Sequence, residues 1–159
     1  MVPESSNLQQ QYEVSCGICR QLIAQFYLLL NIFVERRAYR RKGTVAELAG
    51  LSPGALTHYI QSARCPSALV VIRLADALKL QHYERVLFTQ AYIASRDAVT
   101  RLEMLQAHMA ILSEYQTDSL LEEHKRQHIE TDVSEIHTMF RAQQPLLQEI
   151  ENLRSQTKK

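Results

Sequence analysis

Glycine is scarce in this chain, with only four among 159 residues, and tryptophan is absent. With so few glycines, no loop of the kind that cradles a phosphate group stands out. The sequence also lacks a recognisable order of Ser, His and Asp or a pair of carboxylates suited to acid–base chemistry. We therefore expect a protein that is not an enzyme and that carries no cofactor.

The chain has little that suggests a membrane or secretion. Its longest apolar stretch, residues 22–34, is interrupted by Gln25 and Asn31 and is shorter than a bilayer-spanning helix needs. The first residues show no positively charged segment followed by an apolar run, so we expect no signal peptide. A buried core helix, a cytoplasmic location and no membrane partner follow as predictions.

Cysteine is too rare for a disulfide framework. Cys16 and Cys19 have the C-x-x-C spacing of some zinc and redox sites, and Cys65 or His58 would be the third ligand of such a site. The chain has no second C-x-x-C motif that would complete it. Buried structural thiols are the favoured interpretation, and no metal is expected.

Four histidines lie in the C-terminal part of the chain. His124 and His128 have the four-residue spacing of a helical metal pair, but no third ligand is evident from the sequence. We therefore expect these two, like His108 and His137, to be surface histidines.

The net charge of +1 hides an uneven distribution. Residues 97–159 hold eleven acidic and seven basic residues, whereas Glu47 is the one acidic residue in residues 36–73. The basic residues of that segment are Arg36, Arg37, Arg40, Arg41, Lys42, Arg64 and Arg73. A segment of this charge is suited to a polyanion, although a solvated surface or pairing with the acidic tail would also explain it.

The same segment predicts two short helices joined by a tight turn. Gly50 can adopt the positive φ that ends a helix. Ser52 followed by Pro53 is typical of an N-cap and first residue of the next helix. Small and apolar residues stand where the two helices would meet: Ala46, Leu51, Leu56 and Tyr59.

These residues resemble the helix-turn-helix of the phage-repressor type, the XRE or Cro/repressor family. The resemblance covers roughly residues 21–96, about half of the chain, and implies a five-helix DNA-binding domain. The family often has Gln early in the second helix of its domain, where this chain has Lys42, Gly43 or Thr44, and often Gly where Ser62 stands.

The resemblance and the geometry of a helix in the major groove together indicate which side chains would meet double-stranded DNA. The expected base-reading residues are Ser52, Pro53, Gly54, Thr57, His58 and Gln61. The expected phosphate-binding residues are Arg41, Lys42, Thr44, Ser62 and Arg64.

Helical periodicity extends on both sides of this pair. We expect a long, all-round apolar helix from about residue 8 to residue 41, either as an ordinary core helix or facing a second subunit. The first helix of the pair should start at Thr44 or near Arg41, and the second should span residues 53–61. Two further helices should follow: one capped by Ser67, burying Ile72, Leu74, Ala75 and Leu78, and one over residues 82–95, burying Val86, Leu87 and Tyr92 or Ile93.

Beyond Arg96 glycine is absent, and apolar residues repeat every three or four positions. This pattern predicts two long helices, interrupted between residues 114 and 132, that form a hairpin or coiled coil. They could pair with each other, with the N-terminal helix or across a dimer axis. The expected homodimer interface contains Leu105, Leu112, Ile136 and Phe140.

The sequence thus predicts an all-α protein with a DNA-binding domain in residues 8–96 and a helical extension for dimerisation or partner binding in residues 97–159. We expect a sequence-specific transcriptional regulator, a repressor in most of the family it resembles, that binds a two-part operator as a homodimer. The alternative is an interaction or adaptor protein, such as a phage or plasmid accessory factor or an antitoxin. No small-molecule effector or second protein partner is indicated by any residue.

Overall fold

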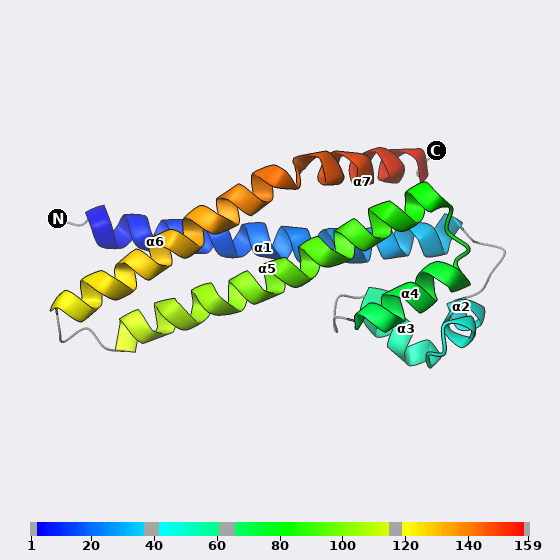
Figure 1. Cartoon of the computed structure of the whole chain (residues 1–159), viewed down its shortest axis with the longest axis horizontal. Coiled ribbons are helices and arrows are strands. Elements are labelled where there is room, and N and C mark those ends of the chain that lie inside the picture. Colours follow the sequence, from blue (N-terminus) through cyan, green and yellow to red (C-terminus); the bar gives the residue numbers. More distant parts are fainter. Residues whose placement is uncertain (1–2, 37–41, 61–65, 115–118, 158–159) are drawn as a thin grey trace. The chain divides into compact units, whose positions relative to one another are not determined.

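The computed structural model describes residues 3–36, 42–60, 66–114 and 119–157, and within these ranges it contains helices and no strand. The all-α fold class is therefore confirmed. The helices, labelled in Figure 1, are α1 (Pro3–Arg36), α2 (Lys42–Leu48), α3 (Pro53–Ile60), α4 (Ala68–Ala77), α5 (His82–Glu114), α6 (Ser119–Ala142) and α7 (Gln144–Thr157).

The chain forms two compact units, each assembled from segments that are distant in sequence. Unit 1 comprises residues 1–22 and 97–144, and unit 2 comprises residues 23–96 and 145–159. These units are clusters of contacts and differ from the expected domain ranges, 8–96 and 97–159, which remain a prediction.

Aromatic side chains of α1 and α5 form the centre of unit 2. Phe26 stacks on Phe88 with ring centroids 5.2 Å apart, and Tyr92 meets Phe26 edge-on with ring centroids 5.7 Å apart. Phe33, about two turns further along α1, meets Phe88 edge-on, and their ring centroids are 5.9 Å apart. Such offset and edge-on arrangements add to the free energy of burying the rings.

The remaining elements of unit 2 close over this aromatic centre. From α7, the apolar side chains of Leu146, Ile150 and Leu153 are buried in the same core. The phenol of Tyr83 on α5 donates a hydrogen bond to the carboxylate of Glu149 on α7. The core also includes buried side chains of α2, α3 and α4, namely Val45, Ala46, Leu56, Tyr59, Val71 and Leu74.

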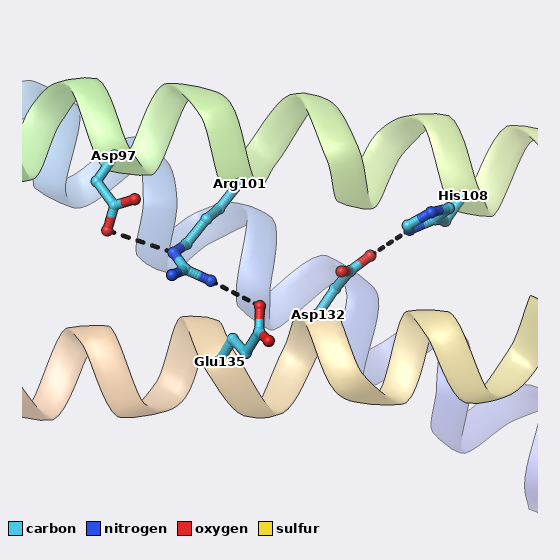
Figure 2. A network of polar contacts seen from close by, with 5 residues as sticks. All are labelled: Asp97, Arg101, His108, Asp132 and Glu135. Atoms are coloured by element: carbon cyan, nitrogen blue, oxygen red, sulfur yellow. Dashed lines mark hydrogen bonds and ion pairs between the residues drawn. The ribbon is translucent and has the colours of Figure 1, made fainter.

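In unit 1 the second half of α5 lies beside α6, and polar contacts bridge the two helices (Figure 2). Arg101 contacts Asp97 on its own helix at 3.3 Å and Glu135 on α6 at 2.8 Å. Further along, His108 Nδ1 lies 2.5 Å from Asp132 Oδ2. Because the arginine pairs are partly exposed, they define the register of the two helices more than they stabilise the fold.

The first helix is longer than its apolar stretch. Within residues 7–36, a window of 18 residues has a mean hydropathy of 1.4, so this segment could cross a membrane by length and composition alone. More than half of that window, 56%, is buried inside the protein. A core helix and a signal sequence share these properties, and the expected cytoplasmic location remains a prediction.

Several helix boundaries differ from the expected ones. The first helix already begins at Pro3; it is described as far as Arg36, and its expected end near Arg41 lies outside the described residues. Because α2 begins at Lys42, the start expected near Arg41 agrees with the structure and the start expected at Thr44 does not. The expected end near Ser95 was wrong, because α5 continues to Glu114 with no glycine or proline to stop it. Of the expected interruption, α5 is described as far as Glu114 and α6 from Ser119, and the residues between them lie outside the described ranges. A further break occurs at Gln143, before Pro145.

Two side chains expected in the core, Ile72 and Val86, lie on the surface, and of the alternatives Tyr92 and Ile93 it is Tyr92 that is buried. Ile72 is 58% exposed, Ile93 is 60% exposed and Val86 is also exposed. In each case the helix buries an adjacent residue instead: Val71 beside Ile72, Leu87 beside Val86 and Tyr92 beside Ile93. The apolar residues on α4 and α5 outnumber those that one buried face can hold, and sequence periodicity alone does not say which are left outside.

The aromatic centre of unit 2 leads to a stability prediction. Phe88→Ala should lower the free energy of unfolding by about 3–5 kcal/mol, because it removes a fully buried ring and leaves a cavity. The control Ile93→Ala, on the same helix but exposed, should change it by less than about 0.5 kcal/mol. Urea denaturation followed by circular dichroism measures both, and equal effects would show that the Phe26–Phe88 contact is not central to the core.

Candidate functional site

The α2–α3 connection is a tight turn centred on Gly50. Gly50 has a φ of 73°, as its place after a helix requires. Its N–H donates to Glu47 O at 3.0 Å, and Leu51 N–H donates to Ala46 O at 2.7 Å. This pair of bonds is the Schellman arrangement, which satisfies carbonyls left free at a helix end.

The second helix starts as the sequence indicates. Ser52 Oγ accepts a hydrogen bond from Ala55 N–H at 3.1 Å, and Pro53 is the first residue of α3. A serine N-cap satisfies a backbone donor that the helix cannot, and proline at the first position loses none. Ser67 caps α4 in the same way, accepting from Val70 N–H at 3.4 Å.

The turn orients α3 so that it has one buried face and one exposed face. Leu56 and Tyr59 are buried in the core of unit 2, and Ala55 is half-buried. Gly54 and His58 are exposed, and Gly54 has open space where a Cβ would be. The predicted split of this helix into inward and outward residues is therefore confirmed at these positions.

The remaining predicted contact residues are described to different degrees. Ser52 and Thr44 are exposed, while Lys42, Pro53 and Thr57 lie in helices without a described side-chain position. Four predicted contacts lie outside the described residues: Arg41, Gln61, Ser62 and Arg64.

One basic residue that was not among the predicted contacts lies beside the turn. A Cβ on Gly50 would be 3.5 Å from Arg73 Nη1, so the exposed Arg73 of α4 places its guanidinium next to the α2–α3 connection. The sequence did show that Arg73 belongs to the basic segment, residues 36–73. That the packing of α4 against α2 brings it to the turn could not be inferred from charge alone.

The residues expected at a dimer interface are largely buried within one chain. Leu105, Leu112 and Ile136 are buried, and Phe140 is half-buried. Packing inside unit 1 therefore buries three of these four side chains without a second subunit. These stripes therefore supply no evidence for the predicted homodimer.

Cys16 and Cys19 are free and buried thiols, in line with a structural role. Burial, and then the proximity of Cys16, raises the pKa of the Cys19 thiol to about 11. At neutral pH this thiol is almost entirely protonated, which makes it a poor nucleophile and a poor metal ligand. Cys65, considered as a third ligand, lies outside the described residues.

An apolar hollow of about 300 Å³ lies between α4 and α5 in unit 2. Its lining includes the buried side chains of Val71, Ala75 and Tyr92 and the exposed side chains of Ile72 and Ile93. Its lining is mostly apolar and includes one basic residue, Arg85, which pairs with Asp76 at 2.7 Å.

No family model matches this chain, and no curated protein or solved structure is similar to it at a significant level.

Two glycine substitutions test the geometry of the turn. Gly50→Ala should lower the free energy of unfolding by about 1–2 kcal/mol, because a residue with a Cβ is strained at this positive φ. Gly54→Ala, inside α3 with open space around it, should instead raise it by about 0.5–1 kcal/mol. Thermal unfolding of the two variants gives the comparison, and a harmless Gly50→Ala would mean that the turn differs from the one described.

Proposed function

We propose that this protein is a sequence-specific DNA-binding transcriptional regulator that uses α2, the turn at Gly50 and α3 as a helix-turn-helix of the repressor type. The observation that carries the proposal is the two-faced α3. Its buried Leu56 and Tyr59 attach it to the core, while Gly54 and His58 remain exposed. A helix held in this way can enter the major groove and bring side chains to base edges.

The small residues of α3 support close approach to DNA. Gly54 has no side chain and open space around it, and Ala55 adds little bulk. In this proposal Thr57, His58 and Gln61 provide the hydrogen-bonding groups that read bases. Gln61 has the donor and acceptor needed for a bidentate contact with adenine.

Basic residues around the helix pair would hold the phosphate backbone. The proposed contacts are Lys42, Thr44, Ser62 and Arg64, with Arg41 extending the track. Arg73, next to Gly50, is added on structural grounds because it places a guanidinium at the same end of α3 as Ser52. Phosphate contacts position the domain and make binding strongly dependent on salt, since each releases counterions.

The direct experiment is a titration of labelled duplex DNA with the purified full-length chain at several salt concentrations. The proposal predicts binding whose affinity falls steeply as salt rises. Absence of binding at low salt, with the protein folded by circular dichroism, would refute it.

Substitutions should separate base contacts from phosphate contacts. Thr57→Ala and Gln61→Ala should each weaken binding to a preferred duplex by about 1–3 kcal/mol and leave binding to random DNA nearly unchanged. Arg64→Ala should weaken both and reduce the slope of log affinity against log salt by about one unit.

The matched controls for these substitutions are Thr131→Ala and Gln127→Ala, which remove the same side chains from exposed positions on α6. Both should bind like the unmodified protein. A loss of affinity in the controls equal to that of Thr57→Ala and Gln61→Ala would remove α3 from the DNA surface.

A two-part operator implies a homodimer with two copies of α3 about one turn of DNA apart. We expect light scattering of the full chain at micromolar concentration to give twice the mass of the 18.3 kDa chain. Because Leu105, Leu112 and Ile136 are buried within one chain, such a dimer has to use other, exposed residues. A monomer at these concentrations would exclude the dimeric operator model.

The hollow between α4 and α5 favours a second candidate function, that of an interaction or adaptor protein which uses the same fold for protein contacts. Exposed apolar side chains such as Ile72 and Ile93 beside a hollow are typical of sites that bind another protein. A chain that binds no DNA at low salt but retains a stoichiometric protein partner through purification would favour this function over the first.

A further inference from the structure

Three imidazole rings from α5 and α6 lie together in unit 1. His124 and His128 of α6 are exposed, and their Nε2 atoms are 3.2 Å apart. The ring of His108 on α5 stacks on that of His128, with centroids 5.2 Å apart. Asp132, one further turn along α6, holds His108 through its Nδ1 atom (Figure 2).

The distance between the two Nε2 atoms suits two ligands of a single metal ion. With zinc–nitrogen bonds of about 2.05 Å, nitrogens 3.2 Å apart subtend an angle of about 103° at the metal. That angle is nearer to the tetrahedral value of about 109°, which zinc prefers, than to the 90° of a square-planar ion. Without a metal, the same separation requires one Nε2 to carry a proton and donate it to the other.

We propose that His124 and His128 chelate a zinc ion through their Nε2 atoms. Among the described residues no group of three or more His, Cys, Asp and Glu side chains is arranged to hold a metal, so the protein supplies two ligands and water completes the coordination shell. Because both imidazoles are exposed, the ion can enter and keep its waters.

The surroundings of the pair favour a defined geometry. The stacked ring of His108 restricts the motion of the His128 ring on one side. His108 is itself anchored, since its Nδ1–H donates to the buried carboxylate of Asp132. The four-residue spacing alone had pointed to surface histidines, and the distance between the nitrogens is the new information.

This site goes beyond the proposed function and does not depend on it. It lies in unit 1, whereas α2 and α3 belong to unit 2. The metal test therefore succeeds or fails whether or not the protein binds DNA.

The test is a titration of the full-length protein with zinc chloride at pH 7.5, against a chromogenic zinc indicator, in the unmodified chain and in variants. The unmodified chain should bind one equivalent, and His124→Gln and His128→Gln should each lower the affinity at least tenfold. His137→Gln, on the same helix but outside the cluster, is the control and should bind normally. Affinity should fall as pH is lowered, because protons compete for the two Nε2 atoms.

Thermal unfolding with and without zinc gives an independent readout. A bound ion stabilises the folded state, so zinc should raise the melting temperature of the unmodified chain but not of the double variant His124→Gln/His128→Gln. Circular dichroism checks that the variants keep their helicity, as substitutions at exposed positions should. Zinc bound by the double variant as tightly as by the unmodified chain, or no zinc bound by either, would overturn the proposal.

Discussion

The fold of unit 2 depends on covering a helix that is apolar around most of its circumference between residues 23 and 34. Phe26, Leu29 and Leu30 of α1 are fully buried, and Tyr27 and Ile32 on other sides of the same helix are nearly so. A helix of this kind needs partners on more than one side, and α5, α7 and the three short helices provide them. The short helices α2, α3 and α4 pack against this core, although each contributes only a few residues to it. The orientation of α3 is one consequence of that packing.

Local signals in the sequence predicted the parts of the candidate site that local chemistry determines. Gly50, Ser52 and Pro53 act within a few residues of themselves, so the end of α2 and the start of α3 appear where expected. The cap at Ser67 follows the same rule. Features that depend on distant contacts were missed, such as the position of Arg73 beside the turn and the exposure of Ile72 and Val86.

The longer helices illustrate the same limit. A change in composition near Arg96 suggested a boundary, yet α5 crosses it because the backbone meets no residue that ends a helix. The apolar stripe of α5 and α6 indicated that these helices need partners, but periodicity does not distinguish a partner in the same chain from a second subunit. In the structure, the burial of Leu105 and Ile136 within one chain answers that question for this stripe. The polar contacts of Arg101 and His108 then set how the two helices align.

The central claim is that α3 is a DNA-reading helix, and its most direct test is selection of the duplexes that the full-length protein binds from a random pool. The account predicts enrichment of one short motif, present as two inverted copies whose centres lie about one helical turn, 34 Å, or a multiple of it apart. A pool that remains random after repeated rounds, although the protein is folded, would contradict it.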